Sequence, residues 1–187
     1  MATKSNIKWL IIGVVLTGIL ILIIGVYQLP AQNSSSSPST LTIDGIECNT
    51  VEGTNHHIHA HIDIFINGKP YKVPSQIGIL PDQKCLYWMH THDDTGIIHI
   101  ESPQNRTFTL GQFFDIWNKK FNNNQIFENV VNNNNNSTLL SVYIDGKEVN
   151  KATDYRNISL GPHDEIAIVY GKPPGNIPSS YDFPEGL

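Results

Sequence analysis

Histidine side chains are concentrated in one part of the chain. Seven of the eight histidines lie between His56 and His99, in two blocks that read HHIHAHIDIF (residues 56–65) and CLYWMHTHDDTGIIHIE (residues 85–101). Neutral imidazole and ionised carboxylate groups are frequent ligands of divalent transition metals. The presence of both kinds of side chain in these blocks therefore predicts a metal site.

The spacing of these histidines is that of β-strands. Residues i and i+2 of a strand point to the same face about 7 Å apart, so two imidazoles in an H-x-H segment can lean onto one ion. The candidate ligands are His57, His59, His61, His90, His92 and His99. The acidic residues that accompany them, as candidates to orient a ligand or to act as acid or base, are Asp63, Asp94 and Glu101.

The two remaining histidines are weaker candidates. His56 points to the opposite face of its strand, and His163 lies in a Gly-Pro turn, where a solvated loop residue is expected. Two readings without a metal stay open. The histidines could form surface hydrogen bonds, or they could form an acid-sensing cluster that titrates between about pH 5 and 8.

The ligand types narrow the choice of metal. Imidazole ligands suit copper and zinc best, and iron and nickel less well. Of the first two metals, copper is slightly preferred to zinc. A blue-copper centre is less favoured because Met89 and His90 point to opposite faces of a strand.

A cupin site would need a glutamate a few residues after its H-x-H segment, whereas the first glutamate after His92 is Glu101. A chain of 187 residues is too short for an amidohydrolase barrel.

The elements that position these residues can be predicted from periodicity. Apolar and polar side chains alternate in several segments, and Asn67-Gly68 and Asp145-Gly146 are typical of two-residue hairpin turns. Strands or hairpins are predicted at 57–73, 85–92, 97–102, 139–149 and 165–170. The asparagine-rich stretch 122–136 is predicted to be a mobile loop.

One segment, residues 107–121, changes to helical periodicity. Thr109 and Gln112 form a capping-box signature at its start. Its apolar stripe consists of Leu110, Phe113, Phe114, Trp117 and Phe121. The predicted fold class is α+β, a mostly antiparallel β domain with one amphipathic helix that follows an N-terminal transmembrane helix. By analogy alone, its C-terminal half could be β-grasp-like.

Residues 9–27 form an apolar block of nineteen residues without a charge. At the rise of an α-helix this block would span a bilayer, and Lys4 and Lys8 before it predict a cytoplasmic N-terminus. A cleaved signal peptide is the alternative, but its apolar region is usually shorter, about 7–15 residues. The expected organisation is a cytoplasmic N-terminus (1–8), a transmembrane helix (9–27), a Ser-rich linker (28–40), an extracytoplasmic His-rich domain (41–175) and a Pro-rich tail (176–187).

The two cysteines agree with an extracytoplasmic location. Cys48 and Cys85 each lie just outside one histidine block, and an oxidising compartment permits a disulfide between them. After Lys4 and Lys8 the chain carries ten basic and seventeen acidic residues, so this part has a formal charge of −7. So acidic a domain is not expected to bind nucleic acid.

Three blocks give the chain a resemblance to a known family: HIHAHIDIFING, CLYWMHTHDDTGIIHIESP and RTFTLGQFFDIW. They resemble those of an uncharacterised prokaryotic family, archaeal especially, of single-pass membrane-anchored extracytoplasmic proteins. The similar region runs from about His57 to Trp117. The resemblance implies an intact domain and the same topology, and it implies no activity.

The sequence therefore predicts a membrane-anchored, extracytoplasmic protein that binds copper or zinc for capture, delivery or structure. A small hydrolytic or oxidative metalloenzyme is the first alternative, with Glu101 or Asp94 as its base. An accessory subunit of a membrane complex is the second. It would require exposed Phe113, Phe114 and Trp117, of which we expect at least two to be buried.

Overall fold

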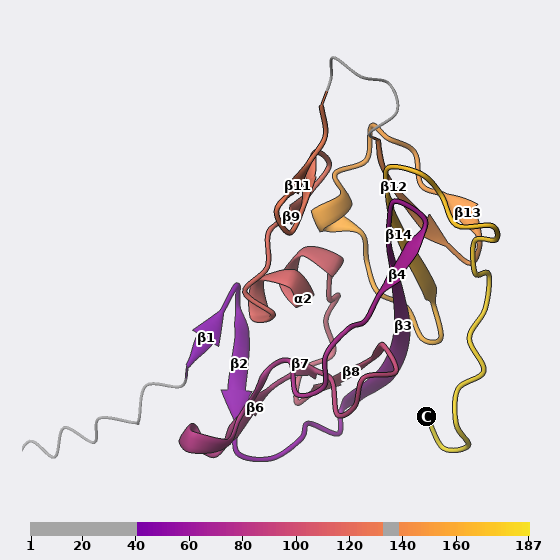
Figure 1. The fold of residues 1–187 in the computed structure, drawn as a ribbon. Helices are drawn as coiled ribbons and strands as arrows, with labels where there is room; N and C mark the ends of the chain where they lie inside the picture. The colour runs from indigo at the N-terminus through magenta and orange to yellow at the C-terminus, as the bar shows by residue number, and fades with distance from the viewer. Residues whose placement is uncertain (1–40, 133–138) are drawn as a thin grey trace, which may run out of the picture. The chain divides into compact units, whose positions relative to one another are not determined.

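The structure is a computed structural model that describes residues 41–132 and 139–187 (Figure 1). The predicted transmembrane helix at 9–27 and the linker at 28–40 lie outside the described residues. Within 41–132 and 139–187, no helix has the length and apolar character needed to cross a membrane.

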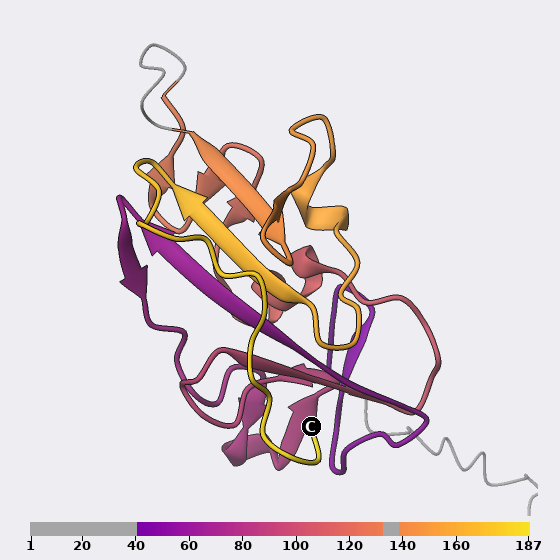
Figure 2. The ribbon, with the colours of Figure 1, turned by 90° about the vertical axis from the view of Figure 1, so that its right-hand side faces the viewer.

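A seven-stranded sheet forms the centre of the domain, in the order β13-β12-β14-β3-β8-β7 with β4 also paired to β3 (Figures 1 and 2). Its strands are β3 (His56–Ile66), β4 (Lys69–Tyr71), β7 (Met89–His90), β8 (Ile97–Ser102), β12 (Leu140–Ile144), β13 (Lys147–Glu148) and β14 (Glu165–Tyr170). All pairs are antiparallel except β14 and β3, which are parallel. The predicted mostly antiparallel domain is confirmed, and the parallel central pair is an addition to it.

Both predicted hairpin turns are present. Asn67 and Gly68 have positive φ values of 52° and 81°, as a type I′ turn requires, and they connect β3 to β4. Asp145 and Gly146, with φ values of 50° and 75°, connect β12 to β13 in the same way. Local turn chemistry thus sets the register of both hairpins.

Helix α2 (Leu110–Ile116) is the single α-helix among the described residues. The capping box between Thr109 and Gln112 is confirmed, but the helix is shorter than the predicted 107–121, because Asn118 adopts a positive φ of 55° soon after it. Its buried side chains join those of the apolar sheet face in one core. This core includes Ile62, Ile64, Met89, Ile98, Ile100, Leu110, Phe113 and Phe114.

A second, four-stranded sheet carries the disulfide. It is ordered β1-β2-β6-β5 and consists of β1 (Thr42–Ile43), β2 (Ile46–Asn49), β5 (Ile79–Leu80) and β6 (Cys85–Tyr87), with a 3₁₀ turn at Pro81–Gln83. The predicted bond between Cys48 and Cys85 is confirmed and joins β2 to β6. The predicted strand 85–92 is divided, because β6 pairs in this sheet while β7 pairs with β8 in the larger one.

The prediction of a loop at 122–136 is wrong for its first half. Three short strands form a small antiparallel sheet there: β9 (Phe121–Asn122), β10 (Gln125–Ile126) and β11 (Asn129–Val130). Ile126 and Phe121 are buried in the core, which explains why this polar stretch is ordered. Residues 133–138 lie outside the described residues. A second 3₁₀ turn is formed by Tyr155–Asn157, after β13.

Candidate metal centre

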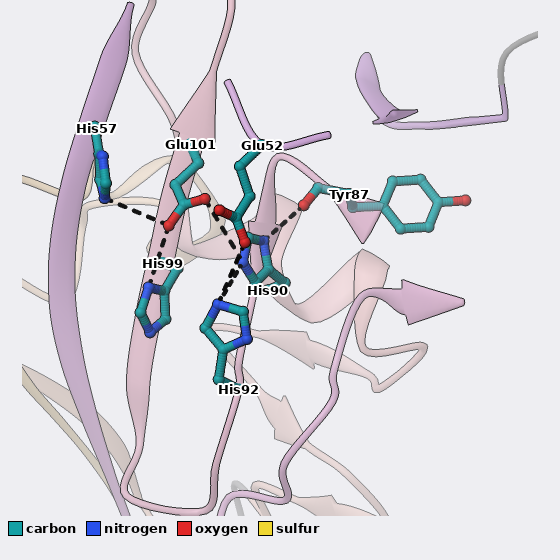
Figure 3. A network of polar contacts seen from close by, with 7 residues as sticks. All are labelled: Glu52, His57, Tyr87, His90, His92, His99 and Glu101. Carbon is teal, nitrogen blue, oxygen red and sulfur yellow. Dashed lines mark hydrogen bonds and ion pairs between the residues drawn. The ribbon is translucent and has the colours of Figure 1, made fainter. Parts of the chain in front are cut away.

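The face of the large sheet opposite α2 carries the histidines. His99 on β8 lies directly between His59 on β3 and His90 on β7, in the register of both strand pairs. Glu101 lies beside His57 in the next row of the same face (Figure 3). The two histidine blocks therefore occupy neighbouring strands, as a shared site requires.

Four side chains on this face form what we call the main donor set. The set consists of His90, His92, His99 and Glu101, and one ligand atom from each lies within 4.8 Å of all the others. The Nε2 atoms of His90 and His92 are 3.3 Å apart, and His90 Nε2 is 4.0 Å from Glu101 Oε2. A small inward movement of these side chains would bring their donor atoms to the distances of a bound ion.

A second donor set shares its carboxylate with the first. It consists of His57, His59 and Glu101, again with ligand atoms within 4.8 Å of one another. His57 Nε2 lies 3.4 Å from Glu101 Oε1, and the rings of His57 and His59 are 4.9 Å apart between centroids. Glu101 therefore lies at the junction of the two sets (Figure 3).

Burial differs across the face. His90, His59, Glu101 and His99 are 0%, 4%, 4% and 9% exposed, whereas the side chains of His57 and His92 at the two margins are 50% and 46% exposed. The centre of the face is thus shielded from water, and each donor set has one histidine that solvent reaches.

The protonation of His90 suits a metal ligand. Its Nδ1 lies 2.9 Å from the carbonyl oxygen of Tyr87, which can only accept, so Nδ1 donates and the neutral ring presents a lone pair at Nε2. Burial lowers the pKa of His90 to about 4, so the ring is neutral at pH 7. The lone pair points toward His92 and Glu101 (Figure 3).

Thr91 holds the segment that carries these two histidines. It is fully buried, its hydroxyl donates to the carbonyl of Pro74 at 3.0 Å, and the same hydroxyl accepts from the amide of Ile77 at 3.0 Å. Because Thr91 is hydrogen-bonded to the loop before β5, the side chains of His90 and His92 on either side of it are held in position beside His99 and Glu101.

Two buried polar atoms of the cluster have no hydrogen-bond partner among the described residues: His59 Nε2 and Glu101 Oε2. Burial, and next the neighbouring His99, lower the pKa of His59 to about 4. Burial alone would raise the pKa of Glu101, but the hydrogen bond from His99 and the other imidazoles lower it below the usual value. An ionised, buried carboxylate among imidazole side chains is an environment that attracts a cation.

His61 lies outside this cluster, in a separate group of possible metal donors with Asp63 and Glu165, so the six predicted imidazoles do not share one site. Its Nδ1 lies 2.7 Å from Glu165 Oε2 and its Nε2 lies 2.8 Å from the carbonyl of Thr95, so both ring nitrogens are engaged. Tyr181 stacks on the ring with centroids 3.7 Å apart. Burial is the largest single effect on the pKa of His61 and lowers it, but the hydrogen bond and the charge of Glu165 and the contact with Thr95 together outweigh burial, so the net shift is upward. Asp63 belongs to this separate group.

Asp94 also lies away from the cluster, contrary to the prediction. It is exposed in the turn after His92, where it forms an ion pair with Lys72. Turn geometry explains the difference, because the neighbouring Asp93 accepts hydrogen bonds from Thr95 and closes the turn on itself. Asp94 is consequently directed to solvent.

The sequence reasoning missed two acidic residues. Glu165 meets His61 only because β14 lies parallel to β3, across 104 residues of sequence, and no local signal marks it. Glu52 lies 3.7 Å from His92 Nε2. Gly53 makes this approach possible, since a Cβ there would lie 2.2 Å from the backbone carbon of Ser102. Glu52 could have been predicted from its position shortly after Cys48. The disulfide to Cys85 brings the segment that contains Glu52 toward His90, which follows Cys85 in the chain.

The C-terminal segment lies on the histidine side of the sheet, while α2 lies on the other side (Figures 1 and 2). Besides the stacking of Tyr181, His163 stacks on Phe183 at 4.6 Å, and its Nε2 contacts the backbone oxygen of Leu187 at 3.0 Å. A pocket of about 280 Å³ lies between this segment and β3. Its lining includes His57, His59, Pro162, His163, Gly186 and Leu187.

Comparisons with protein-family models, with curated proteins and with solved structures find no match. The resemblance of the histidine blocks to a prokaryotic family therefore stays an expectation, and the geometry of the site carries the functional argument.

Proposed function

We propose that this domain binds a divalent transition-metal ion through His90, His92, His99 and Glu101. One observation carries the proposal: donor atoms from these four side chains converge within 4.8 Å, and three of the four residues are buried. Convergence of buried donors is what a preformed metal site requires.

The electrostatics of the cluster support a bound cation over a simple hydrogen-bond network. The Nε2 lone pair of His90 lies 4.0 Å from Glu101 Oε2, and two acceptors cannot satisfy each other. A proton on His92 Nε2, 3.3 Å away, could satisfy His90 but would leave Glu101 Oε2 without a partner among the described residues. Among the described residues, no lysine or arginine forms an ion pair with Glu101. A divalent ion would satisfy both groups and offset the cost of burying the carboxylate.

Copper and zinc are the metals we propose. Three imidazoles and one carboxylate suit both ions, and the Irving–Williams order favours Cu²⁺ over Zn²⁺ at any given set of such ligands. A regular tetrahedral arrangement would favour zinc, and a tetragonal arrangement would favour Cu²⁺. The electronic spectrum of the copper-loaded protein and competition between the two metals would decide between them.

Capture or delivery of the metal is the role that we favour. His92 is half exposed, so an incoming ligand or a partner could reach the ion from that side. The proposed setting is the outer face of a membrane, with residues 9–27 as the anchor and a membrane protein as the metal donor or acceptor. This setting rests on the apolar segment and on Lys4 and Lys8 before it.

A metalloenzyme remains the second candidate, and Glu52 favours it. This half-exposed carboxylate lies 3.7 Å from His92 Nε2, at the margin where a metal-bound water would sit. It would act as the general base, because Asp94 is paired with Lys72 and Glu101 is in the donor set. Loss of activity with retained metal in a Glu52→Gln variant would distinguish catalysis from carriage.

The structure does not favour the third hypothesis, an aromatic docking surface on α2. Phe113 and Phe114 are fully buried in the core of the domain itself, as predicted, and Trp117 is partly buried against the same core. Two of the three required aromatic side chains are therefore inaccessible to a partner.

Metal analysis of the purified full-length chain tests the proposal. The chain would be extracted in mild detergent, stripped with chelator, loaded separately with Cu²⁺ or Zn²⁺ and freed of excess ion. At least one equivalent of one metal per chain is expected. Less than about a tenth of an equivalent of either metal would overturn the proposal.

A further inference from the structure

We infer that the cluster is a two-metal centre in which Glu101 bridges the ions. The main donor set supplies His90, His92 and His99 to one ion, and the second donor set supplies His57 and His59 to the other. This inference rests on the proposed function and extends it, because a single ion could not reach all five imidazoles and the carboxylate at bonding distance.

The position of Glu101 is the first step. Its Oε1 lies 3.4 Å from His57 Nε2 and 3.3 Å from His99 Nδ1, while its Oε2 lies 4.0 Å from His90 Nε2, so the carboxylate contacts histidines of both donor sets (Figure 3). Two ligands of one tetrahedral ion are about 3.3 Å apart, given bonds of about 2.0–2.1 Å. The contact between His57 and Glu101 matches this separation, as does the 3.3 Å contact between His90 and His92.

The second step is the unpaired state of His59. Its Nε2 is buried and has no hydrogen-bond partner among the described residues, although the ring lies 4.7 Å from that of His99. An ion held only by the main donor set would leave this nitrogen unpaired. An ion between His57, His59 and Glu101 would satisfy it, and the 4% exposure of His59 makes that gain substantial.

The third step is the distance between the two sets. The rings of His59, His99 and His90 follow one another across three strands, with centroid separations of 4.7 Å and 5.5 Å. Metal ions in two-metal sites lie about 3.5–4 Å apart and are commonly linked by a shared ligand. Adjacent strands are about 4.8 Å apart. Ions bound by the two donor sets would therefore lie close enough together to share Glu101 as a ligand.

The ion of the second donor set would have an open coordination position. The protein offers it three donors, and the pocket of about 280 Å³ lies against His57 and His59. Water or a small anion could bind there, which is the arrangement of a reactive or exchangeable metal and not of a purely structural one.

Stoichiometry and magnetic coupling of Cu²⁺ in the full-length chain test this inference. Each donor set has one half-exposed histidine, so His57→Ala and His92→Ala can remove a ligand without opening a cavity in the core. His56→Ala is the matched control, because His56 belongs to the same strand as His57 but stacks on Phe108 instead of pointing into the cluster.

We expect two equivalents of Cu²⁺ in the wild-type chain and in His56→Ala, with an electron paramagnetic resonance signal weakened or broadened by coupling between the ions. His57→Ala should bind one equivalent and give an uncoupled mononuclear spectrum. One equivalent in the wild type, with the same mononuclear spectrum in His57→Ala, would overturn the two-metal inference and leave the proposed function intact. No bound metal in the wild type would overturn both. Near-ultraviolet circular dichroism would verify that each variant is folded.

Discussion

The Nε2 atoms of His90 and His92 lie 3.3 Å apart, with only Thr91 between the two residues in the chain. His90 ends β7, and the buried hydroxyl of Thr91 anchors the non-strand segment that carries His92, so both side chains lie on one face. Two imidazole nitrogens at this separation either share a proton or share a metal ion.

Loss of His92 should weaken metal binding at the main donor set. His92→Ala removes one of four donors, so we expect the affinity of that ion to fall by at least about tenfold, measured by competition with a chelating dye. His56→Ala removes a histidine outside both donor sets and should leave the affinity unchanged. Equal affinities in the two variants would exclude His92 as a ligand.

Replacing Glu101 with its neutral isostere should abolish binding while preserving the fold. Glu101→Gln keeps the size of the side chain but removes the single carboxylate common to the two donor sets. We expect metal content close to zero after loading. The melting temperature of the metal-free chain should change little, because Oε2 has no hydrogen-bond partner among the described residues that could be lost. Full metal content in this variant would show that the ion lies elsewhere.

Burial of His59 and His90 should add to the stability of the metal-free protein as the pH rises from about 4 to 6.5. Burial lowers the pKa of His59 and His90 to about 4, from 6.5, so in this range the unfolded chain binds more protons than the folded chain. Stability then rises with pH and is lost as the pH falls through this window, by on the order of 3 kcal/mol for His90.

Urea unfolding in the presence of chelator, at several pH values between 4 and 7, measures this slope. His59→Gln should make the slope less steep, because the variant lacks one of the two histidines whose pKa burial lowers. A slope identical to that of the wild type would contradict the assignment to these histidines.

Substitution of His61 should destabilise the fold but spare the metal. His61→Gln would remove the partner of the fully buried Glu165, and loss of one member of such a pair costs about 3–5 kcal/mol. The double variant with Glu165→Gln should recover part of this stability. Metal content of the folded His61→Gln protein should equal that of the wild type, and a lower content would restore His61 to the ligand set.

Removal of the disulfide should lower stability without changing metal content. The bond between Cys48 and Cys85 closes a loop across 37 positions of sequence, for which chain entropy predicts about 3–4 kcal/mol. The Cys48→Ser/Cys85→Ser variant should therefore unfold at a lower urea concentration. An unchanged midpoint would mean that the reduced chain already keeps the two segments together.

Much of the histidine cluster could be predicted because its cause is local. The pleat of a strand separates His57 and His59 from Ile58 whatever lies around them, and the turn at 93–96 returns His99 beside His90. The capping box of Thr109 and the hairpin turns are local in the same sense. The order in residues 121–130 was mispredicted because burial of Phe121 and Ile126 in the core decides it.

The sequence by itself determined which side chains share a face, where the tight turns lie and that the two cysteines could pair, since each depends on backbone geometry over a few residues. Only the tertiary structure decided which of these side chains meet. The parallel pairing of β14 with β3 brings Glu165 to His61 and withdraws that histidine from the others. The approach of Gly53 to Ser102 brings Glu52 to His92. Such long-range contacts follow from how whole elements pack, and a periodic pattern within one strand carries no information about its neighbours.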